Sequence, residues 1–322
     1  MDGELFARQY KCHLSGYSEW EYRDTCQDSI VFPENIGPRL SIDETCLSQD
    51  EVYTIVTNKE ARGKKGTLVA MIRGTDSWSV ITALRQISAG KRSEVKEVTL
   101  DLSPAMRRIV RMSFPGAVLV NDRFHVQKLF SEAMDDLRIK HRWEAMEAEN
   151  AKIKEHRKNR TKYVPYEFEN GDTRRQLLFR SRRLLLIHQS KWTDCQKARA
   201  AILFRLYPDI KEAYDRYLEL VSIYNTRIAP DLPPDKKEYE RALVLTKLAR
   251  WYDRIDKMKS KCFHIVLDTF KENYLTIMNY FDNRSTNASA ESFNAKVKAF
   301  RNQFRGVRDI SFFIFRLAKI FA

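Results

Sequence analysis

A change of sequence periodicity near residue 126 is the feature that most constrains the fold. Before it, short apolar and β-branched runs predict strands, separated by segments with apolar residues at helical spacing. The predicted strands cover residues 39–48, 51–58, 67–74, 94–103 and 116–126, and the predicted helices cover 77–88 and 103–115. The second helix has Ser103 as its N-cap, Pro104 in its first turn and Pro115 just beyond its end.

The order of these elements is β-β-β-α-β-α-β. Short links make the first three strands antiparallel, and right-handed crossovers through the helices set strands four and five parallel to strand one. Strand four then lies beside strand one. This order predicts an α/β fold with a mixed five-stranded sheet of the ribonuclease H type.

The rest of the chain predicts helices and sets the domain boundaries. Residues 1–38 form an irregular, acidic lead-in, and 39–126 form the first part of the ribonuclease H-like core. Residues 127–281 are rich in Arg, Lys, Glu, Leu and Ala, which predicts a large all-α insertion of about five or six helices. Residues 282–322 complete the core with a polar turn, a helix, a break at Gly306 and a final apolar helix.

Charge points to a polyanionic partner. The 322 residues carry 57 Lys and Arg against 43 Asp and Glu, for a net charge of +14. Residues 1–60 have a net charge of −7 and residues 61–322 have +21. A cationic body of this size favours nucleic acid as the partner. The sequence has no apolar run of membrane-spanning length and its first residues lack the apolar core of a secretory signal, so we expect a cytoplasmic protein with no membrane partner.

Three acidic residues stand out by position. Asp43 lies in the first predicted strand, Asp101 ends the fourth, and Glu291 lies in the helix after the insertion. Three converging carboxylates would recruit a hard divalent cation such as Mg²⁺. Two ions about 4 Å apart would support phosphoryl transfer. Acidic residues at strand ends also serve as turn formers and helix caps, so spacing alone is a weak signal.

The motifs that carry these residues resemble a known family. They are SIDET, then VTLDLSPAMRRIVRMSFPGAVLVNDRFHVQK, and later NASAESFNAKVKAFRNQFRGVRD. In this order they resemble the DDE insertion-sequence transposases of bacteria, in the branch with a D-x-F-H motif. The resemblance covers roughly residues 39–322, although the helical insertion matches only in character. It implies a ribonuclease H-like core interrupted by helices before the last acidic residue.

The resemblance implies roles for individual residues. Asp43 matches the first catalytic position, and Glu291 matches the third. Asp101 and Asp122 compete for the second position. We place Asp101 in the catalytic, metal-binding trio, because its strand lies directly beside that of Asp43. Asp122, His125 and Asn294 become accessory residues, and a purely structural His125 is an equally good reading.

The implied activity is Mg²⁺-dependent cleavage at transposon ends and strand transfer to target DNA, with Mn²⁺ as a substitute and two ions expected. The partners are double-stranded DNA at the ends and target, with a homodimer expected because two ends must meet. The activity would be associated with the nucleoid. The basic residues expected to contact DNA are Arg174, Arg175, Arg182, Arg183, Lys296, Lys298, Arg301 and Arg305.

The chain departs from the family before Asp43. The acidic lead-in lacks the zinc-binding or helix-turn-helix module that reads transposon ends. Either the module is missing and the element is inactive, or a separate N-terminal recognition protein is a further partner. Three alternatives stay open. They are a catalytically inactive, transposase-derived DNA-binding protein, another ribonuclease H-like nuclease, and a helical scaffold with a small sheet.

Overall fold

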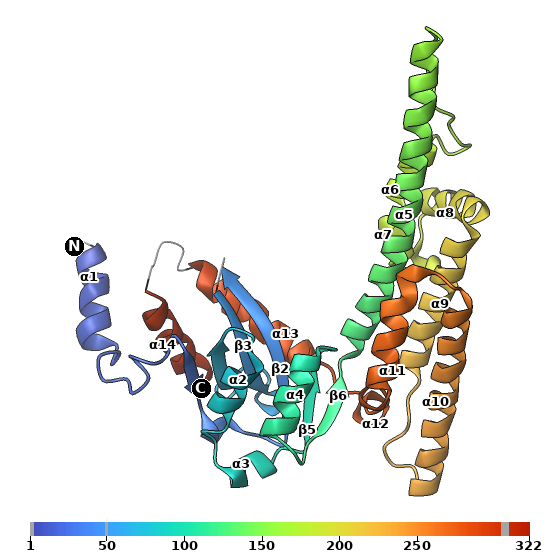
Figure 1. Cartoon of the computed structure of the whole chain (residues 1–322). Coiled ribbons are helices and arrows are strands. Elements are labelled where there is room, and N and C mark those ends of the chain that lie inside the picture. The colour runs from blue at the N-terminus through green and yellow to red at the C-terminus, as the bar shows by residue number, and fades with distance from the viewer. Residues whose placement is uncertain (1–2, 49–50, 304–308) are drawn as a thin grey trace. The chain divides into compact units, whose positions relative to one another are not determined.

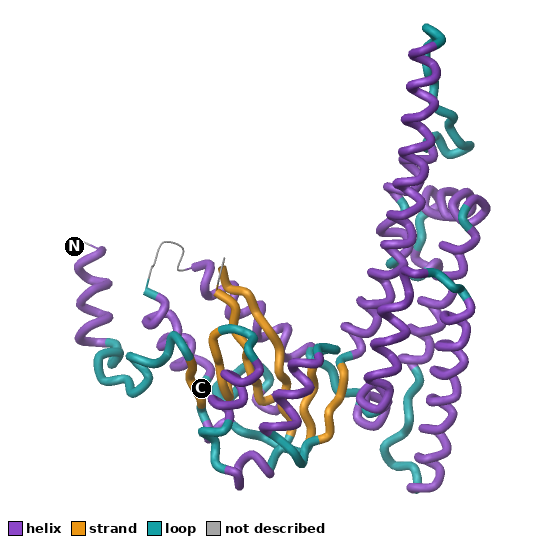
Figure 2. Tube along the Cα trace, viewed as in Figure 1, coloured by secondary structure: helices purple, strands orange, loops and turns teal. Residues whose placement is uncertain are grey.

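The computed structural model describes residues 3–48, 51–303 and 309–322 (Figure 1). The chain divides into two compact units. The first comprises residues 1–122 and 275–322, and the second comprises residues 123–274. Every named strand of the described chain lies in the first unit, as the orange segments in Figure 2 show. The predicted break at Gly306 lies outside the described residues.

The first unit is built on a six-stranded mixed sheet in the order β1-β4-β3-β2-β5-β6. Strands β1 to β4 pair antiparallel, while β2, β5 and β6 pair parallel. The strands are β1 (Ser29–Val31), β2 (Arg39–Ser48), β3 (Glu51–Asn58), β4 (Leu68–Arg73), β5 (Glu97–Leu100) and β6 (Val118–Asn121). The predicted neighbour relation between the first and fourth predicted strands, β2 and β5, is confirmed.

Two details of the predicted sheet are wrong. The sheet has six strands rather than five, because Ser29–Val31 in the lead-in pairs with β4. Three residues are too short to show a strand period in the sequence. The strand predicted over 116–126 ends at Asn121, and the chain enters a helix at Arg123. Asp122 therefore lies at the junction of a strand and a helix.

Helices cover both faces of this sheet. On one face, α2 (Ser77–Leu84) and α4 (Pro104–Ser113) bury their apolar stripes against Leu40, Ile42 and Val98. On the other, α13 (Ala288–Gln303) and α14 (Ile310–Phe321) cover Ile55 and Met71. Each large apolar side chain buried in these layers contributes about 1.5–3 kcal/mol of transfer free energy. The remaining helical segments of this unit are α1 (Gly3–Gln9), η1 (Tyr10–Leu14), η2 (Pro33–Asn35), η3 (Lys59–Ala61), α3 (Ala89–Ser93) and α12 (Tyr280–Asn283).

The alternation within β2 decides which side chains reach which layer. Leu40 and Ile42 enter the core under α2 and α4. Successive side chains of a strand point to opposite faces, so Asp43 faces the other layer, where α13 packs along β2. The same alternation places Val98 and Leu100 of β5 in the core that α2 and α4 cover. The fold thus directs the intervening polar side chains of both strands toward α13.

The second unit is helical. Its first helix, α5 (Arg123–Lys158), runs for 36 residues. The others are α6 (Arg174–Arg180), α7 (Arg182–Leu185), η4 (Gln189–Lys191), α8 (Asp194–Leu206), α9 (Pro208–Asn225), α10 (Pro234–Lys257), η5 (Lys261–Phe263) and α11 (His264–Met278), of which the last crosses into the first unit. The described helices include none that is both long and apolar enough to cross a membrane.

Aromatic packing holds α5 against the other helices of this unit. Phe130 on α5 lies 5.4 Å from Trp251 and 5.1 Å from Phe263, measured between ring centroids. Trp251 in turn lies 4.7 Å from Phe270. The indole of Trp251 is fully buried and donates to the backbone oxygen of Arg216 at 2.8 Å, so its polar atom is satisfied.

Candidate active site

The register of β2 and β5 sets Asp43 level with Asp101. In this parallel pair, Ser41 lies opposite Thr99. Asp43 is two residues beyond Ser41, and Asp101 is two residues beyond Thr99. Residues at the same level of a parallel pair point to the same face, and neighbouring strands are about 4.8 Å apart. Asp43 and Asp101, which lies one residue past the end of β5, are therefore at the same end of two neighbouring strands.

Asp122 continues this row on the next strand. Leu100 lies opposite Asn121 in the parallel pair of β5 and β6, which sets Asp101 level with Asp122. The amide of Asp122 donates to the Leu100 oxygen at 3.0 Å, and the Asn121 side-chain amide donates to the Asp101 oxygen at 2.6 Å. These bonds hold the ends of both strands together. Three neighbouring strands thus each have one aspartate at this end, Asp43 within β2 and the other two one residue past the ends of β5 and β6.

Hydrogen bonds to both carboxylate oxygens hold Asp43 in place. Its Oδ1 accepts from the backbone amide of Glu44 at 2.9 Å, and its Oδ2 accepts from the side-chain amide of Asn294 at 2.8 Å. Asn294 is buried on α13, one turn after Glu291, so both residues lie on the same side of that helix. This hydrogen bond joins α13 to β2 at the position of Asp43.

The carboxyl group of Glu44 lies among other negative charges at this edge of the sheet. Partial burial raises the pKa of the Glu44 carboxyl, and the nearby carboxylates of Asp101 and Asp43 raise it further. Asp101 is half-buried, and its Oδ1 accepts from the backbone amide of Ser103 at 2.8 Å, just before α4. This bond fixes the direction of the Asp101 side chain.

Asp122, His125 and Glu291 form the group best suited to a metal ion among the described residues. One ligand atom from each lies within 4.8 Å of the others. Asp122 is buried, His125 is half-buried on the first turn of α5, and Glu291 is exposed on the first turn of α13. Two carboxylates and one imidazole are donors that Mg²⁺ and Mn²⁺ accept. Of the predicted trio, only Glu291 belongs to this group.

Two asparagines of α13 and its N-terminus lie buried beside these carboxylates. The side-chain oxygen of Asn294 has no hydrogen-bond partner among the described residues, and neither polar atom of the Asn287 side chain has one. The Asn287 backbone oxygen accepts from the amide of Glu291 at 2.8 Å, which starts the helix. Buried polar atoms without partners are costly, and they are found where a ligand or ordered water completes the site.

A buried network beneath the row was missed by sequence reasoning. Glu97 on β5 is only 4% exposed, and it accepts hydrogen bonds from Ser285 and, at 2.9 Å, from Asn283. Lys59 lies 3.9 Å from the same carboxylate and donates to Thr99 at 2.7 Å. Burial lowers the pKa of Lys59, which Glu97 and Asp122 oppose. The network ties the segment before α13 to the sheet, and no sequence spacing signals it.

The basic residues expected to contact DNA fall into different settings. Arg174, Arg175, Arg182 and Arg183 are exposed in the second unit. Lys298 is exposed on α13, and Lys296 donates to the Gly63 backbone oxygen at 3.0 Å. Arg305 lies outside the described residues.

Arg301 departs from its predicted setting. Its guanidinium is largely buried and pairs with Glu51, with nitrogen–oxygen distances of 3.0 and 3.2 Å. The guanidinium also stacks 5.3 Å from the centroid of the Phe313 ring. These contacts assign Arg301 a structural role between α13, β3 and α14. Sequence reasoning could not see the pairing, because Glu51 lies 250 residues away.

Comparison with known proteins agrees with this geometry. Residues 40–317 match the family model DDE_Tnp_ISL3, described as transposase. Because the match covers most of the chain, the protein belongs to this family of transposases. No curated protein and no solved structure matches the chain.

Proposed function

We propose that this chain is a metal-dependent DNA transposase of an insertion sequence. It would cut the phosphodiester at the transposon ends and transfer the released strand to target DNA. The observation that carries the proposal is the group of Asp122, His125 and Glu291, with Asp43 and Asp101 at the same end of the neighbouring strands, in a chain of a transposase family. The sheet has three antiparallel and two parallel strand pairings, with β2 between an antiparallel and a parallel neighbour, which supports a ribonuclease H-like core with a helical insertion.

The donor set fits divalent metal ions. Asp43, Asp101 and Glu291 would be the catalytic carboxylates, and Asp122 with His125 would be accessory ligands beside Glu291. Mg²⁺, or Mn²⁺ in its place, would lower the pKa of a bound water and neutralise charge on the phosphate. The buried, unpartnered atoms of Asn287 and Asn294 support a site completed by ligand and water.

The chain itself supplies orientation. Asn294 and the Glu44 amide hold both oxygens of Asp43, while the Ser103 amide holds one oxygen of Asp101. Fixing carboxylates before the substrate arrives removes an entropic cost from the reaction. The Glu97 network anchors the start of α13, which positions Glu291.

The second unit would supply the DNA surface. Residues 123–274 contain 33 Lys and Arg against 23 Asp and Glu. Of the exposed arginines of this unit, Arg175, Arg182 and Arg183 would neutralise phosphates of double-stranded DNA, with affinity that falls as salt rises. A homodimer would bring two ends together, and a separate recognition protein would read their sequence. Such a protein would act at the bacterial nucleoid.

Strand cleavage by the wild-type chain tests the proposal. The substrate is labelled DNA that carries the element's own terminal repeats, incubated with Mg²⁺, with Mn²⁺ or with EDTA. We expect specific nicking with either metal and none in EDTA. Absence of nicking with both metals, also after addition of a candidate recognition protein, would contradict the proposal and favour a non-catalytic DNA-binding protein.

Asn294→Ala tests the positioning of Asp43. We expect a cleavage rate about 10–100-fold lower, because residues that orient metal ligands have effects of this size. The Mg²⁺ concentration for half-maximal rate should rise as well. Asn302→Ala, an exposed position on the same helix, is the control and should leave both quantities unchanged. A lower rate with an unchanged metal requirement would contradict the positioning role.

A further inference from the structure

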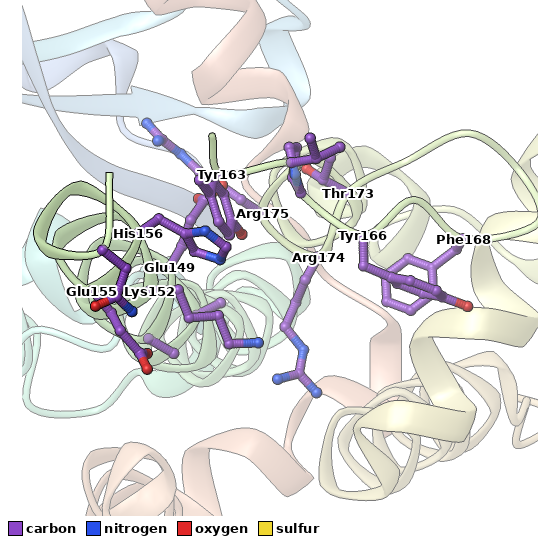
Figure 3. Close-up of a pocket in the computed structure, with 15 residues that line it drawn as sticks. Glu149, Lys152, Glu155, His156, Tyr163, Tyr166, Phe168, Thr173, Arg174 and Arg175 are labelled. Carbon is purple, nitrogen blue, oxygen red and sulfur yellow. The ribbon is translucent and has the colours of Figure 1, made fainter. Parts of the chain in front are cut away.

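The second unit contains a cavity that the proposed chemistry does not use. Its volume is about 630 Å³, within the range of small-molecule sites. The end of α5 forms one wall, and the loop before α6 forms the other. Figure 3 shows Tyr163 and His156 on one side, Tyr166 and Phe168 on the other, and Arg174 extending into the opening.

The aromatic side chains of this cavity present ring surface to solvent. Tyr166 is 72% exposed, and its ring packs edge-on against Phe168 with 5.3 Å between centroids. Tyr163 packs in the same manner against His156, at 5.6 Å. Ligand sites are typically concave and lined by aromatic side chains together with a few polar groups. Flat ring faces of this kind are the stacking platforms that bind unpaired bases.

Charged groups lie beside these rings. Lys152 and Arg174 line the cavity, and both side chains are exposed. The Arg174 guanidinium lies 5.9 Å from the centroid of the Tyr207 ring. This cation–π contact helps to hold the Arg174 side chain in place. Glu149 also lines the cavity and offers acceptor oxygens. Cations suit a phosphate, and a carboxylate suits the amino group of a base.

The loop that carries the rings is anchored. Asp172, at its end, is fully buried and accepts from Arg199 at 2.7 Å and also from Arg180. The Asp172 backbone oxygen accepts from the Phe168 amide at 2.9 Å. Thr173 and Gln176 close a capping box at the start of α6, which fixes the backbone that bears Arg174. The cavity is therefore a built feature of the fold.

From this geometry we propose that the cavity binds unpaired nucleotides of a DNA strand. Tyr166 and Tyr163 would stack on bases, while Arg174 and Lys152 would bind the adjoining phosphates. The assignment rests on the proposed function for DNA as the ligand, and it adds a preference for single-stranded over paired DNA.

The test compares two DNA probes with the full-length chain in EDTA. One is a fully paired duplex. The other, the splayed probe, has the same sequence with a few unpaired nucleotides at one end, including 2-aminopurine. We expect Tyr166→Ala and Arg174→Ala to weaken binding of the splayed probe about tenfold, since stacking contributes roughly 1–3 kcal/mol per base. Binding of the paired probe should change by less than about twofold.

Matched controls keep the test specific. Tyr239→Ala removes an aromatic side chain on α10 that is 64% exposed, and Arg250→Ala removes an exposed arginine of the same helix. Both should bind the two probes as the wild type does. The 2-aminopurine fluorescence should fall when the wild type binds but stay unchanged with Tyr166→Ala, which reports stacking directly.

Equal binding of the splayed probe by Tyr166→Ala and wild type would overturn the assignment. So would an equal loss on both probes, because it would indicate a general phosphate contact. These outcomes are independent of cleavage. A chain that nicks DNA but shows no Tyr166 effect retains the proposed function without the cavity. A chain that shows the Tyr166 effect but never nicks retains the cavity alone.

Discussion

Asp43→Asn, Asp101→Asn and Glu291→Gln should each lower the rate of strand cleavage by about a thousandfold or more. The physical reason is that metal ions supply several kcal/mol of transition-state stabilisation, and each 1.4 kcal/mol is about tenfold in rate. Each substitution removes one negative ligand without changing side-chain size. The measurement is single-turnover nicking of the terminal-repeat substrate in Mg²⁺ and in Mn²⁺.

Asp122→Asn should give a smaller loss, about 10–100-fold, that higher Mn²⁺ partly restores. Asp101 and Asp122 each follow directly after one of the paired residues Leu100 and Asn121, so only this comparison separates their roles. Asp194→Asn, at a carboxylate whose side chain is 98% exposed, is the control and should cleave normally. If Asp122→Asn were inactive and Asp101→Asn nearly normal, the two residues would exchange roles. Normal rates in all four variants would refute the acidic row as the catalytic site.

Asp172→Asn should lower the free energy of unfolding of the second unit by about 3 kcal/mol. Asp172 is fully buried and is bound by Arg199 and Arg180. Its replacement leaves two guanidinium groups without their carboxylate partner, and Arg199 is itself mostly buried. Urea unfolding followed by tryptophan fluorescence at neutral pH measures the difference.

The same residue gives a pH dependence with a defined sign. Burial opposes ionisation of Asp172, yet hydrogen bonds from Arg199 and Arg180 hold its pKa below its usual range. A depressed carboxyl pKa stabilises the folded state above the unfolded pKa of about 3.9, and this stabilisation is lost as pH falls through the lower folded pKa. Wild type and Asp172→Asn should therefore converge in stability at strongly acidic pH.

A surface carboxylate serves as the control for this prediction. Asp253 pairs with Lys257 one turn along α10 and is 60% exposed. Asp253→Asn should change the free energy of unfolding by less than about 0.5 kcal/mol, with little change in its pH dependence. If Asp172→Asn were equally mild, the buried arginine pair would not be a determinant of stability.

The order of the central strands could be predicted from sequence because each strand is bounded by turns or a helix signal. Right-handed crossovers through short helices then allow only one arrangement, in which β2, β5 and β6 are parallel neighbours in that order. The strand β1 was missed because three residues carry no period, and its identity as a strand depends on pairing with β4. Tertiary pairing, not local propensity, decides such an edge strand.

The candidate site was predictable only in part, for a related reason. Asp43 and Asp101 lie level because their strands are neighbours, and neighbours can be inferred from topology. The proximity of Asp122 to Glu291 depends on where α13 packs after a long insertion, which no local pattern encodes. The same holds for Asn294 on Asp43 and for the Lys59–Glu97 pair, whose partners meet only through tertiary packing.

The uninterrupted length of α5 sets a fixed distance between residues at its two ends. His125 on its first turn and Lys152 at the cavity are 27 residues apart on one helix, which corresponds to about 40 Å at 1.5 Å per residue. Duplex DNA rises 3.4 Å per base pair, so a straight duplex lying along this helix would cover about 12 base pairs between the two points. That is roughly one turn of the double helix. Two contact points at opposite ends of α5 would therefore lie about one duplex turn apart.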